Sequence, residues 1–224
     1  MADASPSAQD YLKAIYRLTR EGQAATTNAL AAALGVAPAS VTGMLKRLAA
    51  EQPPLVRYRP RRGATLTPAG QRIALETLRR HRLLELFLVR VLGYGWDEVH
   101  EEAERLEHAI SARMEARIAR LLGEPAFDPH GHPIPAEDLT VPPARGTPLA
   151  RAAVGARGRV VSVSDADSAA LRRLSALGLR PGVVFEVEQR TAGDDLVYLR
   201  VEGRDGAVVI GPALANAIFV EFDR

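Results

Sequence analysis

Histidine and carboxylate side chains recur at helical spacing in the stretch VHEEAERLEHAISARMEARI, which covers residues 99–118. Side chains at positions i, i+4, i+7 and i+8 lie on one face of a helix. In this stretch they are His100, Glu104, Glu107 and His108. In the preceding segment, His81 and Glu85 are also four residues apart. Imidazole and carboxylate ligands without thiolate suit Mn²⁺, Fe²⁺, Co²⁺ or Zn²⁺. The spacing therefore indicates a divalent-metal site formed by two helices.

Two other interpretations of this pattern are open. The face is compatible with solvated charge, because Arg105, Arg113 and Arg117 are spaced to pair with the acids. Helices rich in Glu and His also build the di-metal sites of oxidases, which need Glu-x-x-His pairs on two facing helices. Here the sequence has Glu104-x-x-Glu107-His108 and no second copy of such a pair. The pattern therefore does not match such an oxidase, and we expect that the protein is not an enzyme.

Charge is distributed unevenly along the 224 residues. Residues 1–80 carry twelve basic side chains against five acids, a net charge of +7, whereas residues 81–128 have a net charge of −4. A basic segment next to an acidic one suggests a polyanion as one partner and cations as another. Random surface charge is the alternative, but all five histidines fall between residues 81 and 132.

The composition and the N-terminus favour a cytoplasmic protein. The absence of cysteine excludes disulfides and thiolate ligands, and it suits a reducing compartment. The opening residues MADASPSAQDYLKAIYRL lack the basic and apolar regions of a signal peptide. No apolar run approaches the roughly 20 residues that span a bilayer, so we expect no membrane partner.

The basic segment shows the sequence signals of a winged helix-turn-helix. A first helix is predicted over residues 7–21 from its apolar stripe. Thr26 or Thr27 can cap a second, short helix, and Gly35 permits the tight turn that follows. Pro38 suits the first turn of a third helix. The segment LVRYRPRRGATLT then predicts two strands joined by a tip, which is the wing.

The helix that starts at Pro38 would enter the major groove of DNA. Its apolar residues Val41, Leu45 and Leu48 would face inward. No side chain at its start reads guanine bidentately, so we expect phosphate contacts and DNA shape to contribute strongly. A winged helix used for protein contact is the alternative. The candidate DNA contacts are Thr27, Pro38, Ala39, Ser40, Thr42, Lys46, Arg47, Arg59, Arg61 and Arg62.

Two long helices and a small β domain are predicted after the wing. The helices cover residues 68–92 and 96–122, and a Pro- and Gly-rich segment follows them. Short strands from about residue 156 predict a small β-barrel. The fold class is thus mainly α with β. The predicted domains are a winged-helix domain (1–75), an all-helical metal-binding domain (76–140), a linker (141–155) and an SH3-like domain (156–224).

Five segments occur in order within residues 7–140: VAPASVTGMLKRL, LTPAGQRIA, HRLLELFL, VHEEAERLEHAIS and PHGHPIP. Together they resemble the diphtheria toxin repressor family of metal-dependent transcriptional repressors. LRRLSALGLRPG further along resembles the SH3-like FeoA domain of the longer members. The resemblance implies a homodimer, formed through the helical domain, that binds palindromic double-stranded operator DNA and represses metal-uptake genes when divalent metal is bound. Candidates for its dimer core are Leu84, Phe87, Leu88, Val91, Leu92, Ile110 and Met114.

The resemblance also implies two sets of metal ligands. The primary, activating set is Asp10, Glu104, Glu107 and His108. The ancillary set is His81, Glu85, His100 and Asp167. Asp165 is the neighbouring alternative to Asp167, and Ala170 stands where a polar ligand is expected. His130 and His132 are interpreted as structural residues of a turn, with adventitious metal binding as the alternative.

Besides Ala170, three positions depart from the pattern of the family. Asp10 and Glu104 stand where iron-responsive members have Met and Cys, and oxygen ligands favour Mn²⁺, with Fe²⁺, Co²⁺ and Zn²⁺ as alternatives. Lys13 stands where manganese-responsive members have Glu, which argues for two separated sites over a binuclear cluster. Without metal, we expect the primary-site carboxylates to repel one another and leave the first helix loosely held. An iron-responsive or a metal-independent regulator is the alternative function.

Overall fold

The computed structural model describes residues 4–20, 25–191 and 193–223. The described residues divide into two compact units, and one long helix runs from the first unit into the second. The first unit contains the described residues up to His81, Glu107–Ile110 and Pro135–Thr140. The second contains Arg82–Leu106, Ser111–Ile134 and the described residues from Val141 onward.

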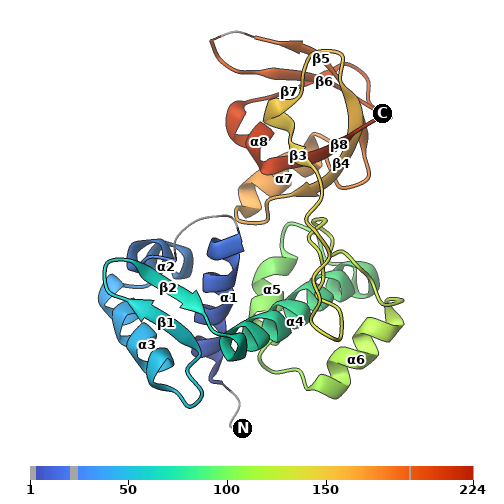
Figure 1. The fold of residues 1–224 in the computed structure, drawn as a ribbon. Helices are drawn as coiled ribbons and strands as arrows, with labels where there is room; N and C mark the ends of the chain where they lie inside the picture. The colour runs from blue at the N-terminus through green and yellow to red at the C-terminus, as the bar shows by residue number, and fades with distance from the viewer. Residues whose placement is uncertain (1–3, 21–24, 192, 224) are drawn as a thin grey trace. The chain divides into compact units, whose positions relative to one another are not determined.

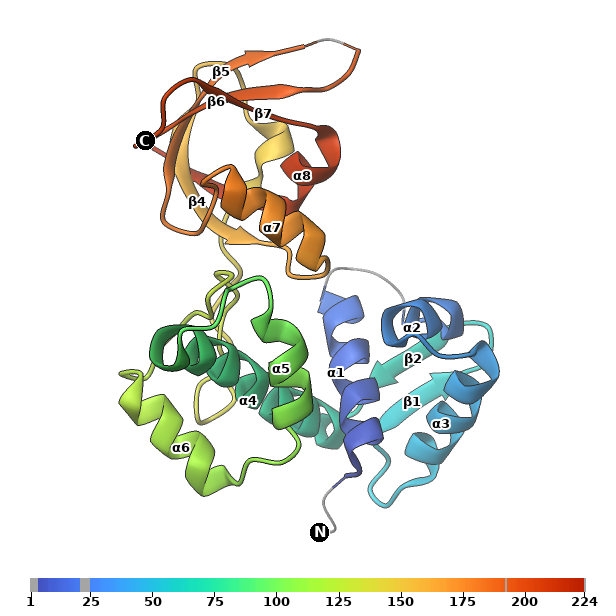
Figure 2. The ribbon, with the colours of Figure 1, turned by 180° about the vertical axis from the view of Figure 1, so that it is seen from behind.

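The first unit contains the predicted winged helix-turn-helix, preceded by one helix (Figures 1 and 2). Its elements are α1 (Pro6–Arg20), α2 (Thr27–Leu34), α3 (Pro38–Ala50), β1 (Val56–Arg59), β2 (Gly63–Leu66) and the start of α4 (Pro68–Leu92). The strands β1 and β2 form an antiparallel hairpin, in which Val56 is opposite Leu66 and Arg59 is opposite Gly63. The predicted end of the first helix, Glu21, lies outside the described residues.

Local sequence signals set the geometry of α2 and α3. The hydroxyl of Thr26 accepts the N–H of Ala29 at 3.2 Å and caps α2. Gly35 ends α2 with φ 65°, in the left-handed region that favours glycine. Pro38 occupies the first turn of α3, where its missing N–H has no helical partner to lose. The turn between the two helices is therefore specified by a few residues.

The core of the first unit lies between α1, α2 and α3. Val41, Leu45 and Leu48 are at most 1% exposed, as predicted for the inward face of α3. They belong to the same buried cluster as Leu12 and Ile15 of α1. Burying this face leaves the other side of α3 exposed to solvent. That side carries most of the α3 residues predicted to contact DNA.

The helix predicted over residues 96–122 is wrong, because the chain leaves the helical conformation after α5. The hydroxyl of Ser111 accepts the N–H of Met114 at 3.2 Å and starts a separate helix, α6. The interruption places Glu107 and His108 in the first unit, where they contact side chains of α1. The two helices are α5 (Val99–Leu106) and α6 (Ala112–Leu121).

The C-terminal part of the second unit is the predicted small β domain. Among the described residues, its strands form one six-stranded antiparallel sheet in the order β3-β8-β4-β5-β6-β7. Phe185, Leu199 and Val160 are at most 1% exposed and lie in its apolar core. The elements are β3 (Thr147–Pro148), η1 (Leu149–Arg151), β4 (Arg157–Val163), α7 (Ser168–Ala176), β5 (Val184–Arg190), β6 (Val197–Val201), β7 (Ala207–Ile210), α8 (Pro212–Ala217) and β8 (Ile218–Phe222).

Among the candidate dimer residues of the second unit, Leu84 and Leu88 are buried, Phe87 is half-buried, and three are exposed. Leu84 and Leu88 are 1% and 2% exposed, so they belong to the interior of the single chain. Val91, Leu92 and Met114 are 48%, 55% and 46% exposed, so they remain available to a partner chain. No single helix of the described chain is long and apolar enough to cross a membrane. Only α2 and α3 taken together, bent by 109°, meet that criterion of length and composition.

Candidate metal centre

Three predicted primary-site ligands come together in the first unit. Asp10 lies on α1, while Glu107 and His108 lie in the turn that follows α5. His108 Nε2 is 2.9 Å from Asp10 Oδ1 and 3.4 Å from Glu107 Oε1. One ligand atom from each residue lies within 4.8 Å of the other two. Two carboxylate oxygens and one imidazole nitrogen at this spacing fit a hard-to-borderline divalent ion.

Gln9, which the sequence analysis missed, orients the imidazole of His108. The distance from His108 Nδ1 to Gln9 Oε1 is 2.7 Å, which makes Nδ1–H the donor to the amide oxygen. This tautomer directs Nε2 toward Asp10 and Glu107. Metal-binding histidines commonly donate their second ring N–H to a protein oxygen in this way. No spacing rule marks Gln9, because its role depends on a contact with a residue 99 positions away.

Glu107 is fully buried and contacts cationic or imidazole groups on both oxygens. Lys13 Nζ donates to its Oε1 at 2.6 Å, and Lys13 is itself only 4% exposed. His81 Nδ1 lies 2.6 Å from its Oε2. The expected repulsion around Glu107 is therefore offset within the chain. Because Lys13 belongs to α1, this ion pair also holds the first helix to the turn without any metal.

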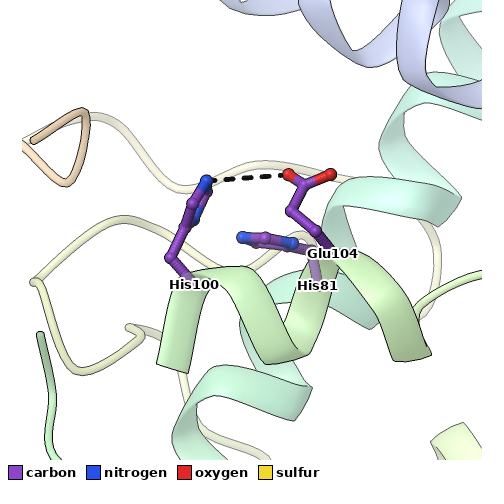
Figure 3. A group of neighbouring side chains, drawn as sticks. All are labelled: His81, His100 and Glu104. Carbon is purple, nitrogen blue, oxygen red and sulfur yellow. Dashed lines mark ion pairs between the residues drawn. The ribbon is translucent and has the colours of Figure 1, made fainter. Parts of the chain in front are cut away.

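Glu104, the fourth predicted primary ligand, lies in the second unit and pairs with His100. Its Oε1 is 3.7 Å from His100 Nε2, one helical turn away on α5 (Figure 3). His81, also drawn in Figure 3, comes from α4. It is 1% exposed, and its Nδ1 is used by Glu107. Glu104 of the predicted primary set thus contacts His100 of the ancillary set, and His81 of the ancillary set contacts Glu107 of the primary set. The two predicted sets are therefore linked by direct contacts.

Glu85 is fully buried on α4 and lies between two imidazoles of the second unit. Its Oε1 is 3.2 Å from His100 Nδ1, and its Oε2 is 3.9 Å from His130 Nδ1. Glu85, His130 and Asp165 also bring ligand atoms within 4.8 Å of one another. The predicted pair of Glu85 and His100 is therefore adjacent to His130, which is interpreted above as a structural residue of a turn with adventitious metal binding as the alternative.

Asp167, the predicted ancillary ligand, caps α7 in the structure. Its Oδ1 accepts the N–H of Ala169 at 2.8 Å, and its side chain is exposed. Asp165 lies closer to the histidines, with Oδ2 3.5 Å from His132 Nδ1. A helix start needs an acceptor for its free N–H groups. In the segment SDADSAAL, Asp167 meets this need, and Asp165 is the carboxylate brought to the histidine cluster.

His130 and His132 lie in the turn predicted for them, but among carboxylates. Burial lowers the pKa of His130, yet Glu85, Asp128 and Asp165 raise it by more, to about 9. Burial likewise lowers the pKa of His132, while Asp128 and Asp165 bring it above its ordinary value. Asp128 was not among the predicted residues, although DPHGH places three potential ligands at alternate positions. This alternation was the signal that could have identified it.

The candidate DNA contacts lie mostly on the solvent side of the winged helix. Thr42 Oγ1 donates to the carbonyl of Pro38 at 3.1 Å, which leaves its methyl group and oxygen lone pairs for other contacts. Arg61 has φ 64° at the wing tip, so the tip turns sharply there. Thr27 and Thr42 are half-buried, whereas the exposed candidates are Pro38, Ala39, Ser40, Lys46, Arg47, Arg59, Arg61 and Arg62.

Comparison with known families matches three successive parts of the chain. Residues 3–64 match the N-terminal DNA binding domain of iron dependent repressors, and residues 67–136 match their metal binding and dimerisation domain. Residues 147–222 match the FeoA domain. The chain belongs to the iron-dependent repressor family. The family consists of iron- and manganese-dependent DNA-binding transcriptional repressors, so the predicted family, fold class and general function are confirmed.

Relatives within the iron-dependent repressor family include proteins named for iron and proteins named for manganese. The iron-dependent repressor IdeR of Mycobacterium leprae is 32% identical over 99% of both chains. The diphtheria toxin repressor of Corynebacterium diphtheriae is 28% identical over 99% of both. A solved manganese-dependent transcriptional repressor in complex with manganese has a TM-score of 0.86 at 40% identity, covering 95% of this chain and 98% of that one. The similarities indicate a transcriptional regulator, and the choice of metal depends on the ligands.

Proposed function

We propose that this chain is a manganese-responsive repressor that binds a palindromic operator as a homodimer when Mn²⁺ is bound. The observation that carries the proposal is the group formed by Asp10, Glu107 and His108, whose donor atoms are oxygen and imidazole nitrogen. Its regulated genes would be those for metal uptake. An iron-responsive regulator of the same family is the second candidate, supported by relatives such as IdeR.

The donor atoms favour Mn²⁺ for a simple reason of ligand hardness. The chain contains no cysteine, and positions 10 and 104 hold Asp and Glu. Hard carboxylate oxygens suit Mn²⁺, whereas sulfur ligands select softer ions. Fe²⁺ stays the second candidate because raw affinity at one site ranks Fe²⁺ above Mn²⁺. Co²⁺ and Zn²⁺ bind the same donors and serve as further probes.

Within this proposal, Glu104 is the fourth primary ligand, after Asp10, Glu107 and His108. A bound divalent ion would supply two positive charges to this group. Asp10 would hold the ion from α1, while His108 would hold it from the turn after α5, with its imidazole oriented by Gln9. Ligation would thus narrow the range of positions open to α1, and an effector acts by shifting such a population.

An ancillary set accompanies the primary site. We assign His81, Glu85 and His100 to it, as the family resemblance implies. Asp165 replaces Asp167 as the carboxylate from the C-terminal domain, because Asp167 is used as a helix cap. The ion pairs of His81 with Glu107 and of His100 with Glu104 each join one residue of either set, which supports a joint response of the two sets.

DNA recognition in the proposal uses α3 and the wing. In a homodimer, two such helices reach successive major grooves of DNA, which requires a roughly palindromic site. Ser40 and Ala39 at the start of α3 are exposed and small enough to approach base edges. Arg61 and Arg62 at the wing tip suit phosphate contacts.

Selection of binding sites from random duplex DNA in the presence of Mn²⁺ would identify the operator. Fluorescence anisotropy on that operator would then compare Mn²⁺ with a chelator. We expect Mn²⁺ to raise the affinity by about 5- to 150-fold, the usual range of coupling between two sites. The double variant Asp10→Asn with His108→Gln should lose this increase but keep the fold. Equal affinity in Mn²⁺ and in chelator would contradict the proposal.

The choice of metal has its own test. The double variant Asp10→Met with Glu104→Cys introduces the sulfur donors found at these positions in iron-responsive members. We expect the metal that stimulates operator binding at lowest concentration to change from Mn²⁺ to Fe²⁺ under anaerobic conditions. An unchanged order of Mn²⁺ and Fe²⁺ would show that ligand hardness does not set the response.

A further inference from the structure

Three potential metal ligands occur at alternate positions in the turn FDPHGHPIP of the second unit. They are Asp128, His130 and His132, and one ligand atom of each lies within 4.8 Å of the other two. None of them belongs to the primary or the ancillary set described above. His130 is 0% exposed and Asp128 is 6% exposed, so the group is largely removed from solvent.

The backbone of this turn is fixed by the Asp128 side chain. Its Oδ1 accepts the N–H groups of His130 at 2.8 Å and of His132 at 2.9 Å. Gly131 has φ 85°, and a Cβ at that position would lie 2.0 Å from the carbonyl oxygen of Val161. Only glycine fits there without movement of the backbone. The two imidazoles are therefore held on a turn that is already formed.

The hydrogen bonding of His130 is typical of a metal-binding histidine. Its Nε2 lies 2.7 Å from the carbonyl oxygen of Trp96, so Nε2–H is the donor. Its Nδ1 is buried and has no hydrogen-bond partner among the described residues. Glu85 Oε2 lies 3.9 Å from it, beyond hydrogen-bond distance, and a buried nitrogen without a hydrogen bond is costly. Donation of the second ring N–H to a backbone carbonyl is what fixes the tautomer of metal-binding histidines.

Like His130 Nδ1, two further buried atoms have no hydrogen-bond partner among the described residues. Asp128 Oδ2 and His132 Nδ1 also lack a hydrogen bond within the described part of the chain, and they lie 3.4 Å apart. Asp128 Oδ2 is the second oxygen of the carboxylate whose Oδ1 accepts the two backbone N–H groups of the turn. One ligand atom from each of the three side chains lies within 4.8 Å of the other two, and buried polar atoms without hydrogen bonds need a cation near them or some other compensation.

The charges around the group favour a cation. The carboxylates of Asp128, Glu85 and Asp165 surround the two imidazoles. Arg82 is the nearby guanidinium, with Nε 3.5 Å from Asp128 Oδ2. The three carboxylates carry three negative charges and Arg82 carries one positive charge, so neutrality needs two further positive charges. Protons on the imidazoles can supply them, and so can one divalent ion.

We propose that Asp128 Oδ2, His130 Nδ1 and His132 Nδ1 bind one divalent transition-metal ion at a site separate from the primary site. Two imidazole nitrogens and one carboxylate oxygen suit Zn²⁺, Co²⁺ or Mn²⁺. The carbonyl oxygen of His130 also accepts the N–H of Val163 in β4 at 2.9 Å. An ion in this turn therefore stabilises the attachment of the turn to the β domain.

Metal counting on the full-length chain tests the site. The protein is stripped with a chelator, reloaded with Zn²⁺ or Co²⁺ and dialysed, and the ions per chain are measured by mass spectrometry. We expect His132→Gln to bind one ion fewer than the unchanged chain and to lose part of the visible Co²⁺ spectrum. Glu137→Gln removes an exposed carboxylate a few residues away and should bind the full number. An equal count in His132→Gln and the unchanged chain would overturn the proposal.

Two more variants keep the result interpretable. Asp128→Asn retains the Oδ1 acceptor that shapes the turn and removes only the charged Oδ2, so it should also lose one ion. His100→Gln removes a ligand of the ancillary set instead. We expect the ion lost in His100→Gln and the ion lost in His132→Gln to be different ions, so that the double variant loses both. If His100→Gln alone accounts for the whole loss, the ion belongs to Glu85 and His100, and the proposal fails. The result is independent of Mn²⁺-stimulated DNA binding, which His132→Gln should retain.

Discussion

At the scale of single residues, the environment of the buried carboxylate Glu107 constrains the proposed primary site. It contacts Lys13, His81 and His108, and its side chain has no exposed surface. A buried carboxylate is tolerated when its charge is paired and hydrogen-bonded. Lys13 supplies this compensation in the absence of metal. The state without metal is therefore more ordered around α1 than simple repulsion of carboxylates suggests.

Replacing Lys13 should make folding depend on metal. In Lys13→Met, the buried Glu107 loses its ammonium partner, and loss of one member of a buried pair destabilises by about 3–5 kcal/mol. We expect this loss in urea unfolding with a chelator and a partial recovery with Mn²⁺. Lys46→Met, which changes an exposed lysine of α3, is the matched control. Equal unfolding free energies for Lys13→Met and the unchanged chain would contradict the role given to Lys13.

Gln9 should affect metal affinity without being a ligand. In Gln9→Leu, His108 Nδ1–H loses its acceptor and the imidazole is no longer oriented. Removal of such an outer partner typically weakens metal binding by about 10- to 100-fold. Calorimetric titration with Mn²⁺ measures this effect. Gln9→Glu keeps an acceptor oxygen and should bind Mn²⁺ with nearly the original affinity. If Gln9→Leu and Gln9→Glu bind alike, the orienting role is wrong.

At the scale of secondary-structure elements, the wing should contribute phosphate contacts. Arg62 is exposed on the hairpin formed by β1 and β2. In Arg62→Ala, we expect weaker binding to operator and to unrelated DNA alike. The slope of log affinity against log salt concentration should fall by about 1 unit. Anisotropy at several salt concentrations measures the slope, with Arg172→Ala on α7 as control. A change confined to the operator would indicate base reading instead.

The elements of the DNA-binding unit could be predicted from local signals. Thr26, Gly35 and Pro38 each perform the backbone task that their residue type suggests. The break between α5 and α6 was missed, because the Glu- and His-rich periodicity continues through it. Ser111 was the available cap signal. Even a segment of strong helix formers leaves the helical conformation where tertiary contacts, here those of Glu107, override intrinsic preference.

The residue types of the candidate metal centre could be predicted from the sequence, but most of the contacts between these residues could not. Asp10 and His108 were placed together only by the family resemblance, since they are 98 positions apart. The partnership of Lys13 with Glu107 was not visible in any spacing. The family resemblance assigns Asp167 as a ligand, whereas the start of α7 uses it as a cap. Such competing local roles cannot be read from residue type alone.

At the scale of the whole molecule, operator binding should depend on dimerisation through exposed apolar side chains. Val91 is 48% exposed at the end of α4, within the matched dimerisation domain. In Val91→Glu, a charge at this surface should disfavour association. We expect a monomer by light scattering and a loss of operator affinity of at least tenfold, because one half-site is then bound alone. Val209→Glu, at an exposed apolar position of β7, is the control. A dimeric Val91→Glu would place the interface elsewhere.

The lysine beside Glu107 also affects how the response depends on metal concentration. Where two ions share a primary site, occupancy rises steeply over a narrow range of free metal. Here the ammonium group of Lys13 already contacts one oxygen of Glu107 and occupies the place of a second cation. We therefore expect each chain to take up a single primary ion, so that occupancy rises gradually with metal concentration. A steep dependence of the response on metal concentration would then require cooperativity between the two chains of the dimer.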